Sequence, residues 1–178
     1  MRATATITLA TATYSTHHDA VRDFDDTWRL RHEGRLDHIT TAVLTRDADG
    51  LLRVERSKNT AKHLAWGGAL LGGALFLVAP TAGAGMLTSV GLRGAGVIIA
   101  HFHDHLRPED VARSGRLLME GPYAVVVVTV VNHEVRETMS PLRRAIAHSS
   151  MATPWGELDD ELGWDRVDHP LEAVLVPT

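Results

Sequence analysis

The sequence contains no cysteine among its 178 residues. This excludes a disulfide framework, a thiolate nucleophile and any zinc or iron–sulfur site with cysteine ligands. Aromatic residues are also scarce, at 5% of the chain, whereas hydrophobic residues as a whole make up 44%. The core must therefore be built mainly from aliphatic side chains.

Asp and Glu slightly outnumber Lys and Arg, and the Lys and Arg residues form no basic stripe. The net charge is −4, and residues 150–178 hold seven acidic residues beside the single Arg166. That segment therefore carries −6 and the rest of the chain about +2. Nucleic-acid binding is disfavoured, because it needs clustered Lys and Arg. Residues 150–178 are interpreted as an acidic tail, which is either solvated or a docking segment for a basic protein partner.

The first unit, residues 1–59, has the order β-α-β-β. Residues 4–14 alternate Thr with apolar residues, which predicts a strand, and Ser15 or Thr16 can cap a helix over residues 17–33 that stops at Gly34. Residues 39–44 and 51–55 predict two further strands. The Asp49-Gly50 pair between these strands is a strong hairpin signal.

Residues 60–105 change character. No charged residue occurs between Leu64 and Leu92, and nine of the fifteen glycines lie between Gly67 and Gly96. Pro80 divides the run into two helices of about 18–20 residues, each roughly one hydrocarbon thickness long. The segment therefore predicts an apolar helical hairpin that is inserted between the third strand and the second core helix.

The unit over residues 106–149 completes the expected domain. A helix after Arg107-Pro108, a buried valine strand over residues 123–131 and a further helix over residues 134–149 are predicted. Without the insert, the order is β-α-β-β-α-β, which predicts an α+β fold of ferredoxin-like type. Residues 171–176, in the acidic tail (150–178), form a possible edge strand.

Small residues recur four positions apart in the insert, a spacing that lets helix backbones approach closely. Such a glycine zipper indicates a hairpin that inserts in a membrane or assembles a homo-oligomer. The alternative is a helix pair that packs on its own domain. Cationic residues on both flanks would place the α/β domain on the cytoplasmic side of the cytoplasmic membrane, with a cytoplasmic location as the alternative. The packing residues of these rows are Ala65, Gly68, Ala69, Gly72, Gly73, Gly91 and Ala95.

One histidine cluster is a candidate metal site. His101, His103 and His105 lie close together beside Asp104, and imidazole pairs bind zinc, copper or nickel. The cluster lacks the glutamate of a zinc-protease helix, and eleven histidines in the chain make such a group expected by chance. The competing interpretation is a polar cap at the end of a helix. No cofactor is predicted.

The run from Val43 to Val131 resembles a family of bacterial membrane proteins of unknown function. The residues that carry the resemblance are the turn at Arg46–Gly50, the Lys58–Ala61 entry, the Gly/Ala hairpin and the segments 104–110 and 118–121. The resemblance implies a membrane location but no activity and no catalytic residues. The histidines near 101–105 and the acidic tail depart from the pattern.

These observations lead to two functional hypotheses. The first is a non-enzymatic, membrane-associated protein that assembles with itself and with the lipid bilayer. The second is a soluble homo-oligomer with a metal, haem or small-ligand site between subunits. No nucleophile motif or phosphate loop indicates an enzyme, and an enzyme that uses the histidines at 101, 103 and 105 is kept as an alternative.

Overall fold

The computed structural model describes residues 6–36, 38–59, 64–90, 95–131 and 138–156. These residues form a five-stranded antiparallel sheet and five helices, so the α+β class is confirmed. In chain order the elements are β1 (Thr6–Tyr14), α1 (His17–His32), β2 (His38–Arg46), β3 (Leu52–Asn59), α2 (Leu64–Val78), α3 (Pro80–Val90), α4 (Ala95–His105), α5 (Pro108–Leu118), β4 (Tyr123–Val131) and β5 (Ala147–Pro154).

The local signals of the first half are confirmed. The Thr16 hydroxyl accepts the N–H of Asp19 at 3.1 Å and caps α1, and Gly34 follows the helix with a φ of 70°. The turn between β2 and β3 is closed by the Gly50 N–H, which donates to the Asp47 carbonyl at 3.0 Å. Gly50 has a φ of 79°, a conformation that residues with a Cβ adopt at a cost.

The strand order is β3-β2-β4-β1-β5. Because β1 and β2 both pair antiparallel with β4, they are parallel to each other and β4 lies between them. The unit β1-α1-β2 is thus a split β-α-β. The ferredoxin-like arrangement is not confirmed, because β3 turns to the outer edge and a fifth strand pairs with β1. Of the described residues after β4, Thr138 and Met139 are helical and β5 begins at Ala147, so the later part of the predicted helix over 134–149 is wrong; residues 134–137 lie outside the described residues.

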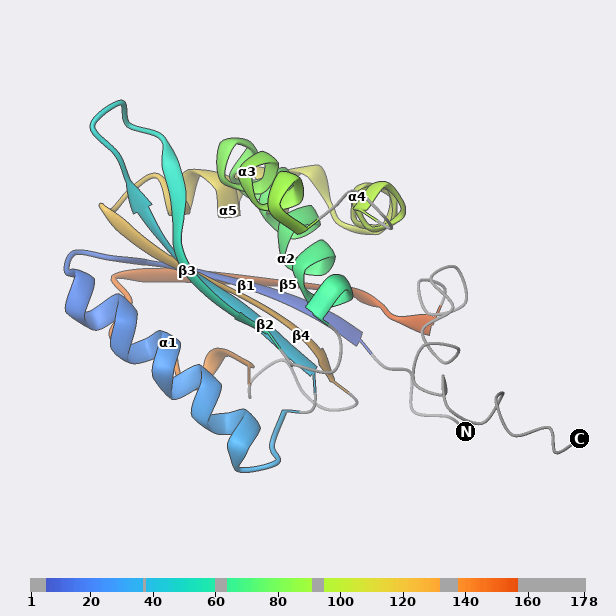
Figure 1. Ribbon diagram of the computed structural model, residues 1–178, viewed down its shortest axis with the longest axis horizontal. Helices are drawn as coiled ribbons and strands as arrows, with labels where there is room; N and C mark the ends of the chain where they lie inside the picture. The colour runs from blue at the N-terminus through green and yellow to red at the C-terminus, as the bar shows by residue number, and fades with distance from the viewer. Residues whose placement is uncertain (1–5, 37, 60–63, 91–94, 132–137, 157–178) are drawn as a thin grey trace, which may run out of the picture.

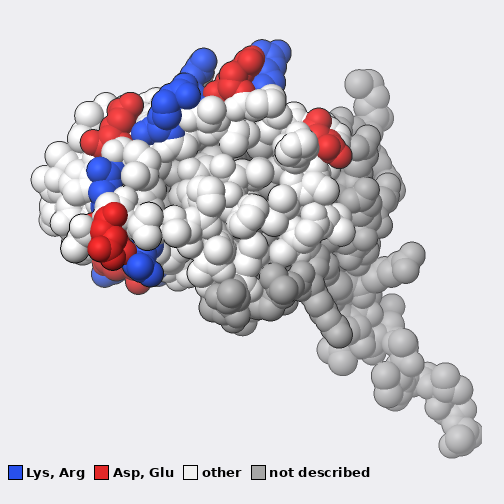
Figure 2. All heavy atoms as spheres, turned by 90° about the horizontal axis from the view of Figure 1, so that it is seen from above, with Lys and Arg blue, Asp and Glu red and all other residues white. Residues whose placement is uncertain are grey.

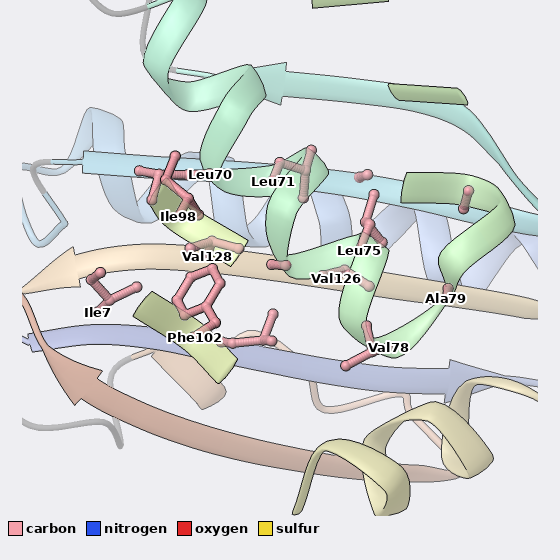
Figure 3. Close-up of a cluster of buried hydrophobic side chains, with 14 of the residues drawn as sticks. Ile7, Leu70, Leu71, Leu75, Val78, Ala79, Ile98, Phe102, Val126 and Val128 are labelled. Carbon is pink, nitrogen blue, oxygen red and sulfur yellow. The ribbon is translucent and has the colours of Figure 1, made fainter. Parts of the chain in front are cut away.

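The sheet lies between two helical layers (Figure 1). Alternate residues of the valine strand β4 point to opposite faces, as the period of two requires. Val125 and Val127 pack with Phe24 of α1, whereas Val126 and Val128 pack with α2 and α4. Figure 3 shows Leu71 and Leu75 of α2 and Phe102 of α4 over this second face. Both faces of β4 are therefore buried, as its unbroken run of valines predicts.

The described residues of the glycine-rich insert form three helices where two were predicted. α2 has 15 residues, and α3 and α4 have 11 each. A 15-residue helix is about 22 Å long, which is short of the ~30 Å hydrocarbon core. None of the helices in the described ranges has both the length and the apolar character needed to cross a membrane. The predicted transmembrane hairpin, and the placement in the cytoplasmic membrane that depended on it, are therefore wrong.

The glycines of the insert bring helices of one chain together. A Cβ added at Gly83 would lie 2.2 Å from the backbone N of Phe76, so α3 crosses α2 there at backbone contact. A Cβ at Gly72 would meet Leu87 of α3 at 2.7 Å, and one at Gly73 would meet Ile98 of α4 at 2.8 Å. The layer leaves a broad area without Lys, Arg, Asp or Glu on the side seen in Figure 2.

Candidate functional site

Charged side chains of α1 and of the loop before β5 meet at one cleft. Arg22, Asp25, Asp26 and Arg29 lie three or four positions apart on α1 and so share one side of the helix. Arg143 and Arg144 come from the loop. We call this cleft of about 450 Å³ the arginine cleft; its lining residues are Arg22, Asp25, Asp26, Arg29, Arg143 and Arg144. Four guanidinium groups and two carboxylates give the lining a net charge of +2.

Asp23 fixes the loop to α1. This residue is completely buried, yet its carboxylate has three hydrogen bonds. Oδ2 accepts the Tyr14 hydroxyl at 3.0 Å and the backbone N–H of Arg144 at 2.9 Å, and Oδ1 accepts the Arg144 guanidinium at 2.6 Å. A buried carboxylate is stable only when it is paired and hydrogen-bonded in this way. The network therefore sets the position of Arg144 at the cleft.

The same network changes two proton affinities. Burial raises the pKa of the Tyr14 phenol far above its ordinary value, and the negative charge of Asp23 adds to this effect. Hydrogen bonds to Asp26 and then to Asp23 raise the pKa of Arg144. Arg144 therefore stays charged, and Tyr14 stays a neutral donor, throughout the physiological range.

The arginines of the cleft differ in how far they are already paired. Nη1 of Arg144 makes the bonds to both Asp23 and Asp26, the latter at 2.9 Å, and Arg29 contacts Asp26 at 2.5 Å. Arg143 donates from Nε to the carbonyl of Ser140 at 3.0 Å. Arg22 is exposed, and its side chain has no hydrogen bond or ion pair within the described part of the chain. Donors for a further acceptor therefore remain at the cleft, chiefly on Arg22 and Arg143.

Lys58 adds a fifth cation beside the cleft. Its ammonium group lies 3.3 Å from Asp25 and 5.1 Å from the centre of the Phe24 ring. Lys58 belongs to β3, so the edge of the sheet comes close to α1 at this point. The pairing with Lys58 partly neutralises Asp25 and leaves the cations of the cleft in excess.

The three candidate metal ligands occupy different environments. His101 is buried, and its Nε2 lies 2.9 Å from the Pro154 carbonyl and 3.0 Å from the Thr153 hydroxyl. His105 stacks on His101 with ring centres 4.3 Å apart, and its Nδ1 lies 2.9 Å from the His101 carbonyl. His103 is exposed beside Asp104. The described residues contain no group of three His, Cys, Asp or Glu that could hold a metal ion.

The predicted packing residues of the insert lie mostly inside the molecule. Gly68, Ala69 and Ala95 are buried, and Gly72 and Gly73 face helices of the same chain. Ala65 lies in the first turn of α2, and Gly91 lies outside the described residues. The arrangement matches the alternative of small-residue helices packed on their own domain.

Sequence reasoning missed the residues that build the cleft. The available signal was Asp23, an acid placed between Ala20 and Thr27 on the buried side of α1. Its partner Arg144 lies 121 positions away, with no motif around it. The pairing could not be inferred without the fold.

The comparisons with known proteins add no assignment. No family model, no curated protein and no solved structure matches the chain. The resemblance to bacterial membrane proteins of unknown function therefore stays a prediction.

Proposed function

We propose that this protein is a non-enzymatic binding protein that holds a small phosphate-bearing molecule in the arginine cleft. The supporting observation is the excess of guanidinium groups over carboxylates in a cleft of about 450 Å³. This volume is within the range of small-molecule sites, ~300–1,000 Å³.

Phosphate is the ligand chemistry that suits this cleft. A guanidinium group presents a planar fork of N–H donors that matches two phosphate oxygens, and such charge-assisted bonds are about twice as strong as neutral ones. Arg22 and Arg143 approach from different elements, so a phosphate between them would receive donors from both sides. Asp23 holds the adjacent Arg144 in place, which reduces the entropy lost on binding.

The absence of reactive groups from the lining supports binding without chemistry. The residues that line the cleft include no hydroxyl, thiol or imidazole group. A nucleophile paired with a general base would require such a group or an activated carboxylate. Both lining carboxylates instead lie within ion-pair distance of a cation.

Calorimetric titration of the full chain with inorganic pyrophosphate, at fixed ionic strength, tests the proposal. We expect saturable binding by the wild-type chain. The affinity should fall about tenfold in Arg22→Gln and about tenfold in Arg143→Gln, since a charged hydrogen bond contributes roughly 1.5 kcal/mol. Arg113→Gln is the matched control. Arg113 is exposed on α5, on the opposite side of the sheet, so its substitution should leave the affinity for pyrophosphate unchanged.

Two results would overturn the proposal. One is a lack of saturable binding by the wild-type chain, and the other is equal loss of affinity in the cleft variants and in Arg113→Gln. Equal loss would mean that pyrophosphate senses only the overall charge. Homo-oligomer formation and a basic protein partner for the acidic tail stay predictions that this titration does not address.

A further inference from the structure

A second depression lies between β3 and α3 and is independent of the arginine cleft. Its volume is about 500 Å³. Val54 and Ser57 line it from the face of β3 that carries α2–α5, whereas Glu55 and Arg56 line it from the face that carries α1. Because residues from both faces of one strand take part, the depression follows the outer edge of β3. We call it the β3 groove; α3 contributes Thr81, Ala82, Gly85 and Met86.

β3 is the last strand in the sheet order on its side, and no strand of the described chain pairs with its outer edge. The backbone of such an edge is a template for an added strand. Where a helix runs alongside the edge, side chains of the added strand can enter the space between strand and helix. Figure 1 shows α3 beside β3 in this way.

The chemistry of the groove selects among possible added strands. Arg53, Arg56 and Lys58 outnumber Glu55 on β3, while Val54 and the α3 residues Ala82 and Met86 give the groove an apolar part. The other edge strand, β5, contains no Lys, Arg, Asp or Glu. An extended segment that combines apolar and acidic residues is therefore suited to β3 and not to β5.

The chain itself contains such a segment. Residues 157–178 hold seven acidic residues and one arginine, and Leu171–Val176 reads Leu-Glu-Ala-Val-Leu-Val. Fourteen residues separate Gly156 from Leu171, enough to span ~50 Å when extended. A tethered segment also has an effective concentration in the millimolar range. We propose that residues 171–176 bind the β3 groove of their own chain as an added strand, with Glu172 near Arg56.

Hydrogen exchange of the full chain, read by mass spectrometry, tests this proposal. We expect the amides of 171–176 to exchange at least tenfold more slowly than in a synthetic peptide of residues 165–178. Val174→Pro should abolish this protection and speed exchange in β3, because proline has no N–H and interrupts strand pairing. Gly163→Pro, in the stretch between β5 and the segment, is the matched control and should change neither.

A charge exchange provides a second test that does not depend on proline. Arg56→Glu should lower the protection of 171–176 severalfold, and Glu172→Arg in the same chain should restore it. The proposal is overturned if 171–176 exchanges as fast as the free peptide, or if Val174→Pro speeds exchange in β5 and leaves β3 unchanged. Protection that rises with protein concentration would overturn it as well, since a second copy would then supply the strand.

Discussion

Arg144 contacts Asp23 twice, through its backbone N–H at 2.9 Å and through its guanidinium group at 2.6 Å. The backbone bond holds the loop against α1, and the guanidinium bond holds the charge of Arg144 beside that of Asp23. Asp23 is fully buried, while the side chain of Arg144 is 34% exposed. One end of the pair therefore belongs to the core and the other end to the surface of the arginine cleft.

This relationship predicts a large stability effect for Arg144→Ala. The substitution leaves the Asp23 carboxylate buried with only Tyr14 and a backbone N–H as partners, at a cost of roughly 2–3 kcal/mol in the free energy of unfolding. The double variant with Asp23→Asn should be less destabilised than the sum of the single variants. Urea unfolding of all four proteins measures the coupling, and strictly additive effects would contradict it.

Tyr14 predicts a loss of stability at alkaline pH. Its pKa is raised from the ordinary 10.0 by burial and then by Asp23, so the folded state favours the neutral phenol. The stability that Tyr14 contributes is complete below pH 10. It is lost as the pH rises towards the pKa of Tyr14 in the folded state, because Tyr14 releases its proton at a lower pH in the unfolded chain. Between pH 10 and 11 the contribution of Tyr14 to the slope of the free energy of unfolding against pH should approach about −1.4 kcal/mol per pH unit.

The measurement compares the wild type with Tyr14→Phe by denaturant unfolding from pH 8 to pH 11. Tyr14→Phe should be less stable at pH 8, because Asp23 loses a donor, and the gap should narrow as the pH rises. A constant difference across the range would show that Tyr14 does not titrate on unfolding.

Two glycines of α3 predict opposite effects of the same substitution. A Cβ at Gly83 would lie 2.2 Å from the backbone N of Phe76, whereas a Cβ at Gly85 would meet nothing within 4 Å. Gly83→Ala should destabilise by about 2 kcal/mol or more, because α3 must move away from α2. Gly85→Ala should stabilise by about 0.5–1 kcal/mol through helix propensity. Thermal unfolding of both variants provides the test, and equal effects would refute this account of the crossing.

The β2–β3 turn predicts an acid-sensitive hairpin. The Asp47 carboxylate accepts hydrogen bonds from the side chain of Arg53 and from the backbone N–H groups of Leu51 and Asp49. These bonds lower the pKa of Asp47, and the bond from Arg53 has the largest effect, followed by the bond from Leu51 and then the bond from Asp49. The resulting stability is present above the ordinary pKa of 3.8 and is lost as the pH falls through the folded value. Asp47→Asn should remove this part of the acid dependence. Exchange of the β3 amides between pH 2 and pH 5 measures it.

Much of the first half of the fold could be predicted, because its signals are local. The cap, which was predicted at Ser15 or Thr16 and is formed by Thr16, the stop at Gly34 and the Asp-Gly turn each act within a few residues. The valine run identified β4 as a strand buried on both faces. In contrast, strand order depends on pairings between distant segments, and no pattern in the sequence indicates that β4 enters between β1 and β2.

The insert was misread for a physical reason. An uncharged run of this length suits either lipid or a protein interior, and composition alone does not distinguish them. The boundary between two helices was correctly placed at Pro80, the first residue of α3, but a further helix, α4, follows from Ala95. The cleft was missed because Asp23 and Arg144 are joined only by the tertiary structure. Neither residue stands in a recognisable motif.

The central position of β4 has a consequence for how the chain reaches this structure. β1 and β2 are not bonded to each other. β2 has β3 as an early partner, but both partners of β1 come late in the chain; Thr13 and Tyr123, for example, meet across 110 positions. During synthesis the ribosome therefore releases β1, α1, the β2–β3 hairpin and the glycine-rich helices before β4, the strand that lies between β1 and β2. Such long-range pairing slows folding and prolongs the exposure of apolar surface. A nascent chain that has not yet emerged beyond β4 should be the species most dependent on chaperones.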